Sequence, residues 1–240
     1  MNGPHRVRFS ATTHRGKVRK INEDSIVTLP DHQVWVVSDG MGGHAGGDFA
    51  SQTIVDTIAM IEPGLPAGEL LQALRRAIFH AHDVIVAESQ NRGGATMGAT
   101  VVCFVMAEGH FATFWVGDSR LYRLQNGKIQ MLTSDHSLVA ELVHSGVMDW
   151  DEAELHPHSN AVTRAVGVGD DLLLDKIRGE VFPGDRFLLC SDGLTKYATF
   201  AILERALASE PIETVADTLQ QLALDGGGAD NISVVVVDVI

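Results

Sequence analysis

Basic residues are scarce in this chain, and the shortage limits what the protein can bind. The 240 residues include 18 Lys and Arg against 31 Asp and Glu, which gives a formal net charge of −13 at pH 7. Nucleic acids and anionic membranes are bound through a basic face, so we expect neither as a partner. A metal site counted without its metal would account for part of the negative charge.

Cysteines and long apolar runs are also rare. The two cysteines, Cys103 and Cys190, lie within apolar, strand-like runs, and we expect buried reduced thiols rather than a disulfide. No apolar run reaches the length of a membrane span, and Met1 to Phe9 lacks the apolar stretch of a signal peptide. These features predict a cytoplasmic protein without a membrane span. Hydrophobic residues make up 45% of the chain, which suffices for the core of one large domain or of two small ones.

The chain does have acidic residues at turns, each beside an apolar run or a Gly-rich turn. Asp39, Asp118 and Asp192 each follow a strand-like run, and Asp230 stands just before one. In antiparallel strands the end of one strand lies beside the start of its neighbour, so these side chains can meet at one edge of a sheet. The full acidic set is Glu23, Asp24, Asp39, Asp118, Asp192 and Asp230.

This acidic set predicts a metal site. Clustered carboxylates repel one another unless a cation lies between them, and carboxylates without Cys or clustered His favour hard cations such as Mg²⁺ or Mn²⁺. Gly40 and Gly193 directly follow two of the aspartates, so the backbone there can turn sharply and offer a carbonyl. Two such ions, roughly 4 Å apart, activate a shared water for in-line attack on phosphorus. The sequence supplies no protein nucleophile, since neither cysteine lies in a positively charged loop.

Two basic side chains near the acidic set can act on a phosphate. Arg19 lies just upstream of the first acidic pair, and its guanidinium can hold two phosphate oxygens. His44 lies in the turn after Asp39 and can protonate a leaving alkoxide. The pairs His80–His82 and His156–His158 are spaced as zinc ligands can be, but no Cys or third ligand lies nearby. We interpret them as helix-surface and loop histidines.

Hydrophobic periodicity predicts a mixture of strands and helices. Strands are expected at 7–12, 26–29, 34–38, 99–106, 111–116, 119–124, 128–132, 172–181, 186–190 and 232–237. Helices are expected at 48–61, 67–88, 137–145, 149–155, 200–208 and 212–224. The turns Glu108-Gly109 and Asn126-Gly127 are strong hairpin signals. Hairpins exclude a purely parallel sheet, which leaves antiparallel sheets with helices packed outside.

Five short motifs together carry a resemblance. They are Arg19-Lys20-Ile21-Asn22-Glu23-Asp24, Asp39-Gly40-Met41-Gly42-Gly43-His44, Gly117-Asp118-Ser119-Arg120, Ser191-Asp192-Gly193-Leu194 and Asp230-Asn231-Ile232-Ser233. With these motifs in this order, the chain resembles the bacterial metal-dependent protein serine/threonine phosphatases of the PPM type, the protein phosphatase 2C family. One Asp-Gly motif alone would carry little weight, whereas five in family order, over essentially the whole chain, are specific.

The resemblance implies an α+β fold, a four-layer α-β-β-α sandwich with two antiparallel β-sheets flanked by helices. It implies a single phosphatase catalytic domain over residues 1–240. Within it, residues at about 136–160 correspond to a variable flap subdomain beside the cleft, which is thought to influence substrate choice. We call residues 136–160 the flap segment.

The resemblance also implies metal-binding roles for this chain's residues. Asp39 would bridge two metals, and the Gly40 carbonyl would bind one of them. Asp192 and Asp230 would complete the first metal. Asp118, together with Asp192, matches the position of a weaker third metal in bacterial members.

Further roles follow from the same resemblance. Glu23 would act on the second metal through water, and Asp24 would hold nearby waters or bases. Arg19 matches the phosphate-binding arginine of the family.

The chain departs from the family pattern at a few positions. Many eukaryotic members have a histidine where this chain has Met41, whereas bacterial members share the Met and carry a His three residues on, here His44. The general-acid role therefore moves to His44. Asp48 stands where Glu is commoner, and Thr195 to Ala198 differ from the usual continuation after Asp-Gly-Leu.

The activity implied is metal-dependent hydrolysis of phosphoserine and phosphothreonine in proteins by a metal-activated water, with two or three Mn²⁺ or Mg²⁺ ions. The partners would be phosphorylated proteins and a cognate bacterial Ser/Thr kinase, which the enzyme opposes, and we expect a monomer. Two alternatives are weighed. A non-catalytic binding or sensing module would be favoured by loss of Asp39, Asp192 or Asp230, and none is lost. A two-metal nuclease would need a basic groove, against which the net charge argues.

Overall fold

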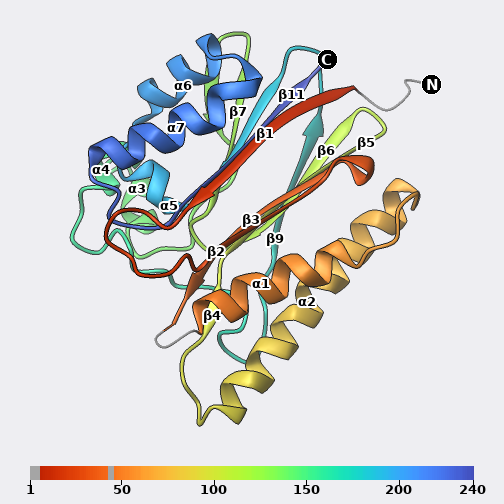
Figure 1. Ribbon diagram of the computed structural model, residues 1–240, viewed down its shortest axis with the longest axis vertical. Coiled ribbons are helices and arrows are strands. Elements are labelled where there is room, and N and C mark those ends of the chain that lie inside the picture. Colours follow the sequence, from red (N-terminus) through yellow and green to blue (C-terminus); the bar gives the residue numbers. More distant parts are fainter. Residues whose placement is uncertain (1–5, 43–45) are drawn as a thin grey trace.

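Two antiparallel β-sheets pack face to face, and helices cover the outer side of each sheet (Figure 1). The computed structural model describes residues 6–42 and 46–240. The arrangement confirms the predicted α-β-β-α sandwich with antiparallel sheets. None of the helices in the described part of the chain combines the length and the apolar composition that a membrane crossing requires.

The six-stranded sheet follows the path β2-β3-β5-β6-β9, and β4 pairs with β3 at one end. Its strands are β2 (Asp24–Leu29), β3 (Val34–Met41), β4 (Gly98–Ala99), β5 (Val101–Ala107), β6 (His110–Val116) and β9 (Asp175–Glu180). The five-stranded sheet has the order β1-β11-β10-β7-β8. Its strands are β1 (Val7–His14), β7 (Arg120–Gln125), β8 (Lys128–Met131), β10 (Arg186–Cys190) and β11 (Ile232–Val239).

The helices fall into two outer layers and a set of short connecting pieces. The longer ones are α1 (Gly47–Ala59), α2 (Ala67–Asn91), α6 (Phe200–Ser209) and α7 (Ile212–Gly226). The short ones are the 3₁₀ helix η1 (Pro30–His32), α3 (Ala140–His144), α4 (Trp150–Ala153) and α5 (Asp192–Thr195). In Figure 1, α1 and α2 lie against the six-stranded sheet, and α6 and α7 lie against the other sheet.

Three apolar clusters fill the spaces between the layers. Alternate residues of a strand point to opposite faces of a sheet. Accordingly, Val34 and Val36 of β3 pack under α1 and α2, while Trp35 and Val37 face the other sheet. A third cluster lies under α6 and α7. β3 is therefore buried on both faces, which fixes the position of the residues at its end.

The first and last described strands bring distant parts of the chain together. β1 pairs with β11 in a register that runs from Val7 opposite Val239 to His14 opposite Ile232 (Figure 1). The loop after β1, which carries Arg19 and Glu23, therefore lies beside the residues that precede β11. The sheet pairing alone places Asp230 near this loop.

Most expected elements are present, with shifted ends. Both hairpin turns are confirmed, since Glu108, Gly109, Asn126 and Gly127 all have positive φ, as such turns require. The strand expected at 172–181 begins only at residue 175, because Leu172 and Leu174 belong to a loop that packs into the apolar cluster under α1 and α2.

Other differences concern helices and the cysteines. The helix expected at 137–145 covers only Ala140–His144, because Ser137 pairs with Val162 in an isolated bridge. The helix α5, directly after β10, was not expected. Cys103 and Cys190 are buried and free, as predicted.

Candidate active site

A cavity of about 340 Å³ lies at the end of the sandwich where the acidic residues collect. Every predicted site residue except Asp24 and His44 lines it. The lining residues are Arg19, Glu23, Asp39, Gly40, Met41, Gly42, Thr100, Asp118, Asn160, Val162, Asp192, Asp230 and Asn231. His44 lies outside the described residues. The site thus gathers side chains from distant parts of the chain, such as Arg19 and Asp230, which are 211 residues apart.

The carboxylates reach the cavity from both sheets. Asp39 belongs to the six-stranded sheet and lies opposite Asp24 in the β2–β3 register. It lies within β3 rather than after its end, which corrects the position expected for it. Asp192 opens α5 directly after β10, and Asp230 stands before β11. Asp118 follows β6, the strand next to β5.

Two glycines allow the close backbone contacts of the site. A Cβ atom on Gly40 would lie 2.2 Å from the Gly47 carbonyl oxygen, at the start of α1. A Cβ atom on Gly193 would lie 1.9 Å from the Asn231 carbonyl oxygen. Real Cβ atoms do not approach this closely, so any other residue would force these segments apart. The sharp turn expected at Gly40 is wrong, since Gly40 lies within β3 and pairs with Ala99. The role that the structure gives both glycines is to let neighbouring segments touch.

Like charges crowd the centre of the cavity. Burial raises the pKa of Asp39 well above the usual value of an aspartate, and the neighbouring carboxylates raise it further. Burial, followed by the charge of Asp192, does the same to the pKa of Asp118. Burial also raises the pKa of Glu23. Carboxylates that resist ionisation in this way are stabilised in their charged form by a cation placed between them.

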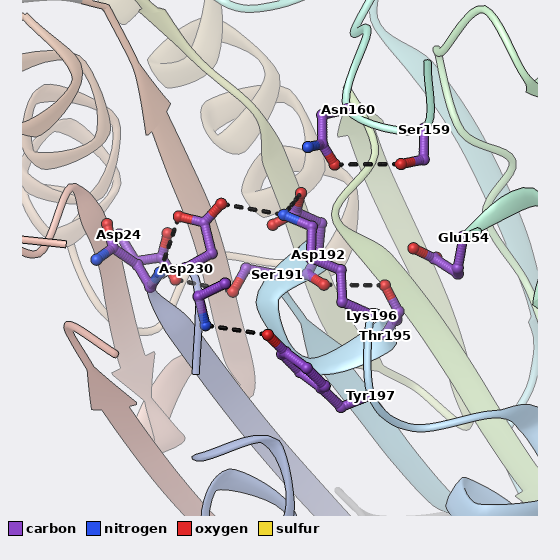
Figure 2. Close-up of polar contacts among 12 residues, drawn as sticks. Asp24, Glu154, Ser159, Asn160, Ser191, Asp192, Thr195, Lys196, Tyr197 and Asp230 are labelled. Atoms are coloured by element: carbon purple, nitrogen blue, oxygen red, sulfur yellow. Dashed lines mark hydrogen bonds and ion pairs between the residues drawn. The ribbon is translucent and has the colours of Figure 1, made fainter. Parts of the chain in front are cut away.

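Asp24 lies behind the cavity rather than on its wall. Its Oδ2 atom accepts hydrogen bonds from the Ser191 hydroxyl at 2.8 Å and the Ser233 hydroxyl at 2.7 Å (Figure 2 shows Asp24 and Ser191). Burial raises its pKa to about 7, against the opposing effect of the two serines. Its Oδ1 atom is buried without a hydrogen-bond partner among the described residues. This oxygen and the crowded carboxylates fit a site for hard cations.

Arg19 lies at the rim of the cavity, and its side chain is 50% exposed. Its guanidinium grips Asp230 with two nitrogens, Nε at 2.8 Å from Oδ1 and Nη2 at 2.9 Å from Oδ2. Asn231 holds the loop that carries Arg19, since its side chain accepts the Glu23 N–H and donates to the Arg15 and Ile21 carbonyls. The predicted phosphate-binding arginine is thus placed at the open side of the acidic cluster.

Lys196 is a residue beside this cavity that the sequence did not reveal, as are the lining residues Thr100 and Val162. Its Nζ atom lies 2.7 Å from Asp192 Oδ2 and 3.0 Å from Asp230 Oδ2 (Figure 2). The lysine after Asp-Gly-Leu-Thr departs from the family pattern, and this departure is the signal that the sequence offers for it. Nothing in the sequence showed that the side chain bridges two carboxylates 38 residues apart.

The carboxylates are not arranged around a common point as they lie. Within residues 6–42 and 46–240, no three Asp, Glu, His or Cys side chains are grouped closely enough to hold one metal ion. The contacts above account for this arrangement, because Asp192 and Asp230 are directed toward Lys196 and Asp24 toward two serines. The oxygens needed for a metal line one cavity, but several have other partners.

The histidine pairs take no part in this site. His82 is buried, and its Nδ1 atom accepts the Gly167 N–H at 3.0 Å. This corrects the expectation that it lies on the helix surface. His156 and His158 lie in the loop after α4, as expected, with His156 Nδ1 accepting the His158 N–H.

Comparison with known proteins adds to this geometry. Residues 12–227 match the sequence model of the family described as Protein phosphatase 2C. Serine/threonine protein phosphatase PstP of Mycobacterium tuberculosis is 35% identical over 235 residues, which make up 98% of this chain and 45% of that protein. Serine/threonine phosphatase stp of Listeria monocytogenes is 36% identical over 239 residues, or 94% of this chain and 93% of that protein. The chain therefore spans less than half of the first relative and nearly all of the second.

Solved structures are similar over the whole fold. PppA, described as a key regulatory component of T6SS in Pseudomonas aeruginosa, has a TM-score of 0.91 and 39% identity, with 100% of each chain covered. The catalytic domain of serine threonine protein phosphatase PstP in complex with two manganese ions has a TM-score of 0.88 and 34% identity, with 98% of each chain covered.

Proposed function

Because the chain belongs to the protein phosphatase 2C family, we propose that it removes phosphate from phosphoserine and phosphothreonine in proteins, using two or three Mn²⁺ or Mg²⁺ ions. One observation carries the proposal. Carboxylates from both sheets, which lie far apart in the sequence, line a single cavity with an arginine at its rim. Carboxylates in such an arrangement can hold a pair of cations, and the cations together with the nearby guanidinium can bind a doubly charged phosphate.

The roles proposed for the metal ligands follow their positions. Asp39 would hold both ions from β3, together with the Gly40 carbonyl. Asp192 and Asp230 would hold the first ion from the other sheet, and Asp118 with Asp192 would hold a third. When bound, the paired ions supply a water of lowered pKa and offset the charge of the phosphate.

The remaining site residues would act on water and phosphate. Glu23 would orient water at the second ion, and buried Asp24 would fix the position of the segments around it through Ser191 and Ser233. Arg19 would bind two phosphate oxygens. His44 would give a proton to the leaving serine or threonine oxygen.

The proposal extends to organisation and partners. We place the whole of residues 1–240 in one catalytic unit that works as a monomer, with the flap segment beside the cleft. Its substrates would be phosphorylated proteins and its counterpart a cognate Ser/Thr kinase. Two free, buried thiols support a reducing compartment, the cytoplasm.

The test measures phosphate released from a phosphothreonine peptide and from p-nitrophenyl phosphate, with Mn²⁺ and with EDTA. Asp39→Asn keeps the shape of the side chain and removes its charge, and we expect turnover to fall by at least about 100-fold. The matched control is Asp56→Asn, the same change at an exposed position on α1, which should retain the wild-type rate. Turnover that survives EDTA, or an Asp39→Asn rate near that of the wild type, would refute the assignment.

A further inference from the structure

Lys196 occupies the space between two carboxylates that we assign to a metal. Its ammonium group lies within 3.0 Å of one oxygen from each of Asp192 and Asp230, and its side chain is only 17% exposed. In Figure 2 the lysine side chain extends from the end of α5 toward both carboxylates. A lysine held by two acids in a partly buried cleft is not a loosely solvated surface group.

The local structure directs the lysine into this position. Asp192 and Lys196 are four residues apart at the two ends of α5, a spacing that puts both side chains on one face of a helical turn. The Lys196 N–H donates to the Asp192 carbonyl at 3.1 Å, which holds the turn closed. Asp230 comes to the same face because the strand that follows it, β11, pairs with β10. No change of backbone is needed to bring the ammonium to both acids.

The electrostatics favour a charged lysine at this point. The ammonium lies at ion-pair distance from two carboxylates, 2.7 Å from Asp192 Oδ2 and 3.0 Å from Asp230 Oδ2. It therefore supplies one positive charge beside a cavity that Glu23, Asp39 and Asp118 also line.

We infer that Lys196 is a built-in cation that competes with the first divalent metal ion for Asp192 and Asp230. In the metal-free protein its ammonium links the two acids. An ion bound by the same oxygens has to displace the ammonium or share them with it. The protein would then need more metal than a homologous site without this lysine, and would keep its site ordered when metal is scarce. The inference rests on the proposed function, since it takes these acids as metal ligands.

The first experiment compares Mn²⁺ affinity by isothermal titration calorimetry of metal-free protein. Lys196→Met keeps most of the side-chain volume and removes the charge. Because a unit charge within about 4 Å acts strongly on its neighbours, we expect Mn²⁺ to bind at least about tenfold more tightly. Lys128→Met, which removes the same charge from an exposed position on β8, should bind as the wild type does. Lys196→Arg keeps the charge and should also stay near the wild type.

The second experiment measures thermal unfolding without metal and with saturating Mn²⁺. Lys196→Met leaves Asp192 and Asp230 without the ammonium, so it should unfold at a lower temperature than the wild type in EDTA. Saturating Mn²⁺ should remove this deficit. Circular dichroism checks that the variant is folded, and Lys196→Gln replaces it with the same expectations if it is not.

Three outcomes would overturn the inference. Equal Mn²⁺ affinities for the wild type and Lys196→Met would show that the lysine does not compete. Weaker binding by Lys196→Met would show that it assists the metal. Absence of Mn²⁺ binding in both proteins would refute the metal assignment itself, and the proposed function with it. The first two outcomes leave the phosphatase activity of the wild type intact, so the two failures are distinguishable.

Discussion

Asp230 forms ion pairs with both basic side chains of the site. Arg19 bonds both of its carboxylate oxygens, and Lys196 bonds one of them. Burial alone would raise its pKa, but the charge of Lys196 and the contacts of Arg19 hold the pKa below its usual value. A carboxylate kept ionised in this way can bind a metal ion. The guanidinium of Arg19 and the ammonium of Lys196 already contact it, however, so a metal ion has to compete with both for its oxygens.

Arg19 is half exposed at the rim of the cavity. Its side chain can either bind the phosphate of the substrate or orient Asp230, and substitution distinguishes these two roles. We expect Arg19→Ala to raise KM for a phosphopeptide by about tenfold or more, with a smaller fall in kcat. The reason is that two charge-assisted hydrogen bonds to the phosphate are lost from both the bound substrate and the transition state. Steady-state kinetics at saturating Mn²⁺ gives both constants.

The control for the Arg19 prediction is a substitution of the neighbouring residue, Lys20. Lys20→Ala removes a cation from the adjacent exposed position and should change KM little. An unchanged KM in Arg19→Ala, together with weakened Mn²⁺ activation, would mean that the arginine serves to orient Asp230 instead of binding the phosphate.

The sequence identified the acidic residues of the site but not their partners. Asp39 and Asp230 were recognisable because each stands in a short motif beside a strand. The bonds of Asp24 to Ser191 and Ser233 cross from one sheet to the other, and the approach of Lys196 to Asp230 depends on the pairing of β10 with β11. Contacts of this kind follow from tertiary packing, which no local pattern encodes.

At the scale of elements, a buried arginine fastens the flap segment to the five-stranded sheet. Arg120 of β7 donates from Nε and Nη2 to the Asp135 carboxylate, and its Nη1 atom lies 2.8 Å from Glu154 Oε1. The guanidinium also lies 5.0 Å from the centre of the Trp150 ring. Glu154 and Trp150 belong to the flap segment, so one side chain joins it to a strand that begins two residues after Asp118.

We expect substitutions of Arg120 and of Glu154 to have different effects on stability and on hydrogen exchange. Arg120→Met leaves Asp135 and Glu154 buried without their cation, which should lower the free energy of unfolding by about 3–5 kcal/mol. Glu154→Gln removes only the ion pair between Arg120 and the flap segment and leaves the Trp150 contact, so hydrogen exchange should quicken there while the sheets stay protected. Urea unfolding and hydrogen exchange measured by mass spectrometry provide the two readouts.

A surface ion pair serves as the comparison. Arg8 is 55% exposed and pairs with Glu213, and Arg8→Met should cost no more than about 1 kcal/mol. If Arg120→Met were equally mild, or if Glu154→Gln left exchange in residues 136–160 unchanged, the buried arginine would not be what anchors the flap segment.

Elements with strong local signals were predictable, and those set by tertiary contacts were not. The positive φ angles of Glu108 and Asn126 follow from turn chemistry that is visible in the sequence. α2 was expected because its apolar residues recur at helical spacing. The four-residue helix α5 has too few residues for any periodicity, and the late start of β9 depends on where the loop before it packs.

At the scale of the whole molecule, the site joins the two sheets at one end of the sandwich. In the middle, side chains such as Phe104 and Phe187 hold the sheets together, with ring centres 4.5 Å apart. At the end with the cavity, Asp39 lies in the six-stranded sheet, whereas Asp192 and Asp230 lie in segments that flank strands β10 and β11 of the five-stranded one. Ions held by all three would connect the two sheets, so metal binding should stabilise the whole fold against unfolding and not only order the site.

This geometry predicts that metal stabilises the entire sandwich. A ligand at 100 times its Kd adds about 2.7 kcal/mol per site, and each kcal/mol raises Tm by about 2–4 °C in a domain of this size. We therefore expect saturating Mn²⁺ to raise the Tm of EDTA-treated protein by about 5–10 °C for each bound ion in calorimetry. Asp39→Asn should lose most of this gain, because Asp39 is the proposed ligand on the six-stranded sheet, whereas Asp56→Asn should retain it. An equal gain in Asp39→Asn would place the bound ions on one sheet or on the surface, and the connection between the layers would then rest on the core alone.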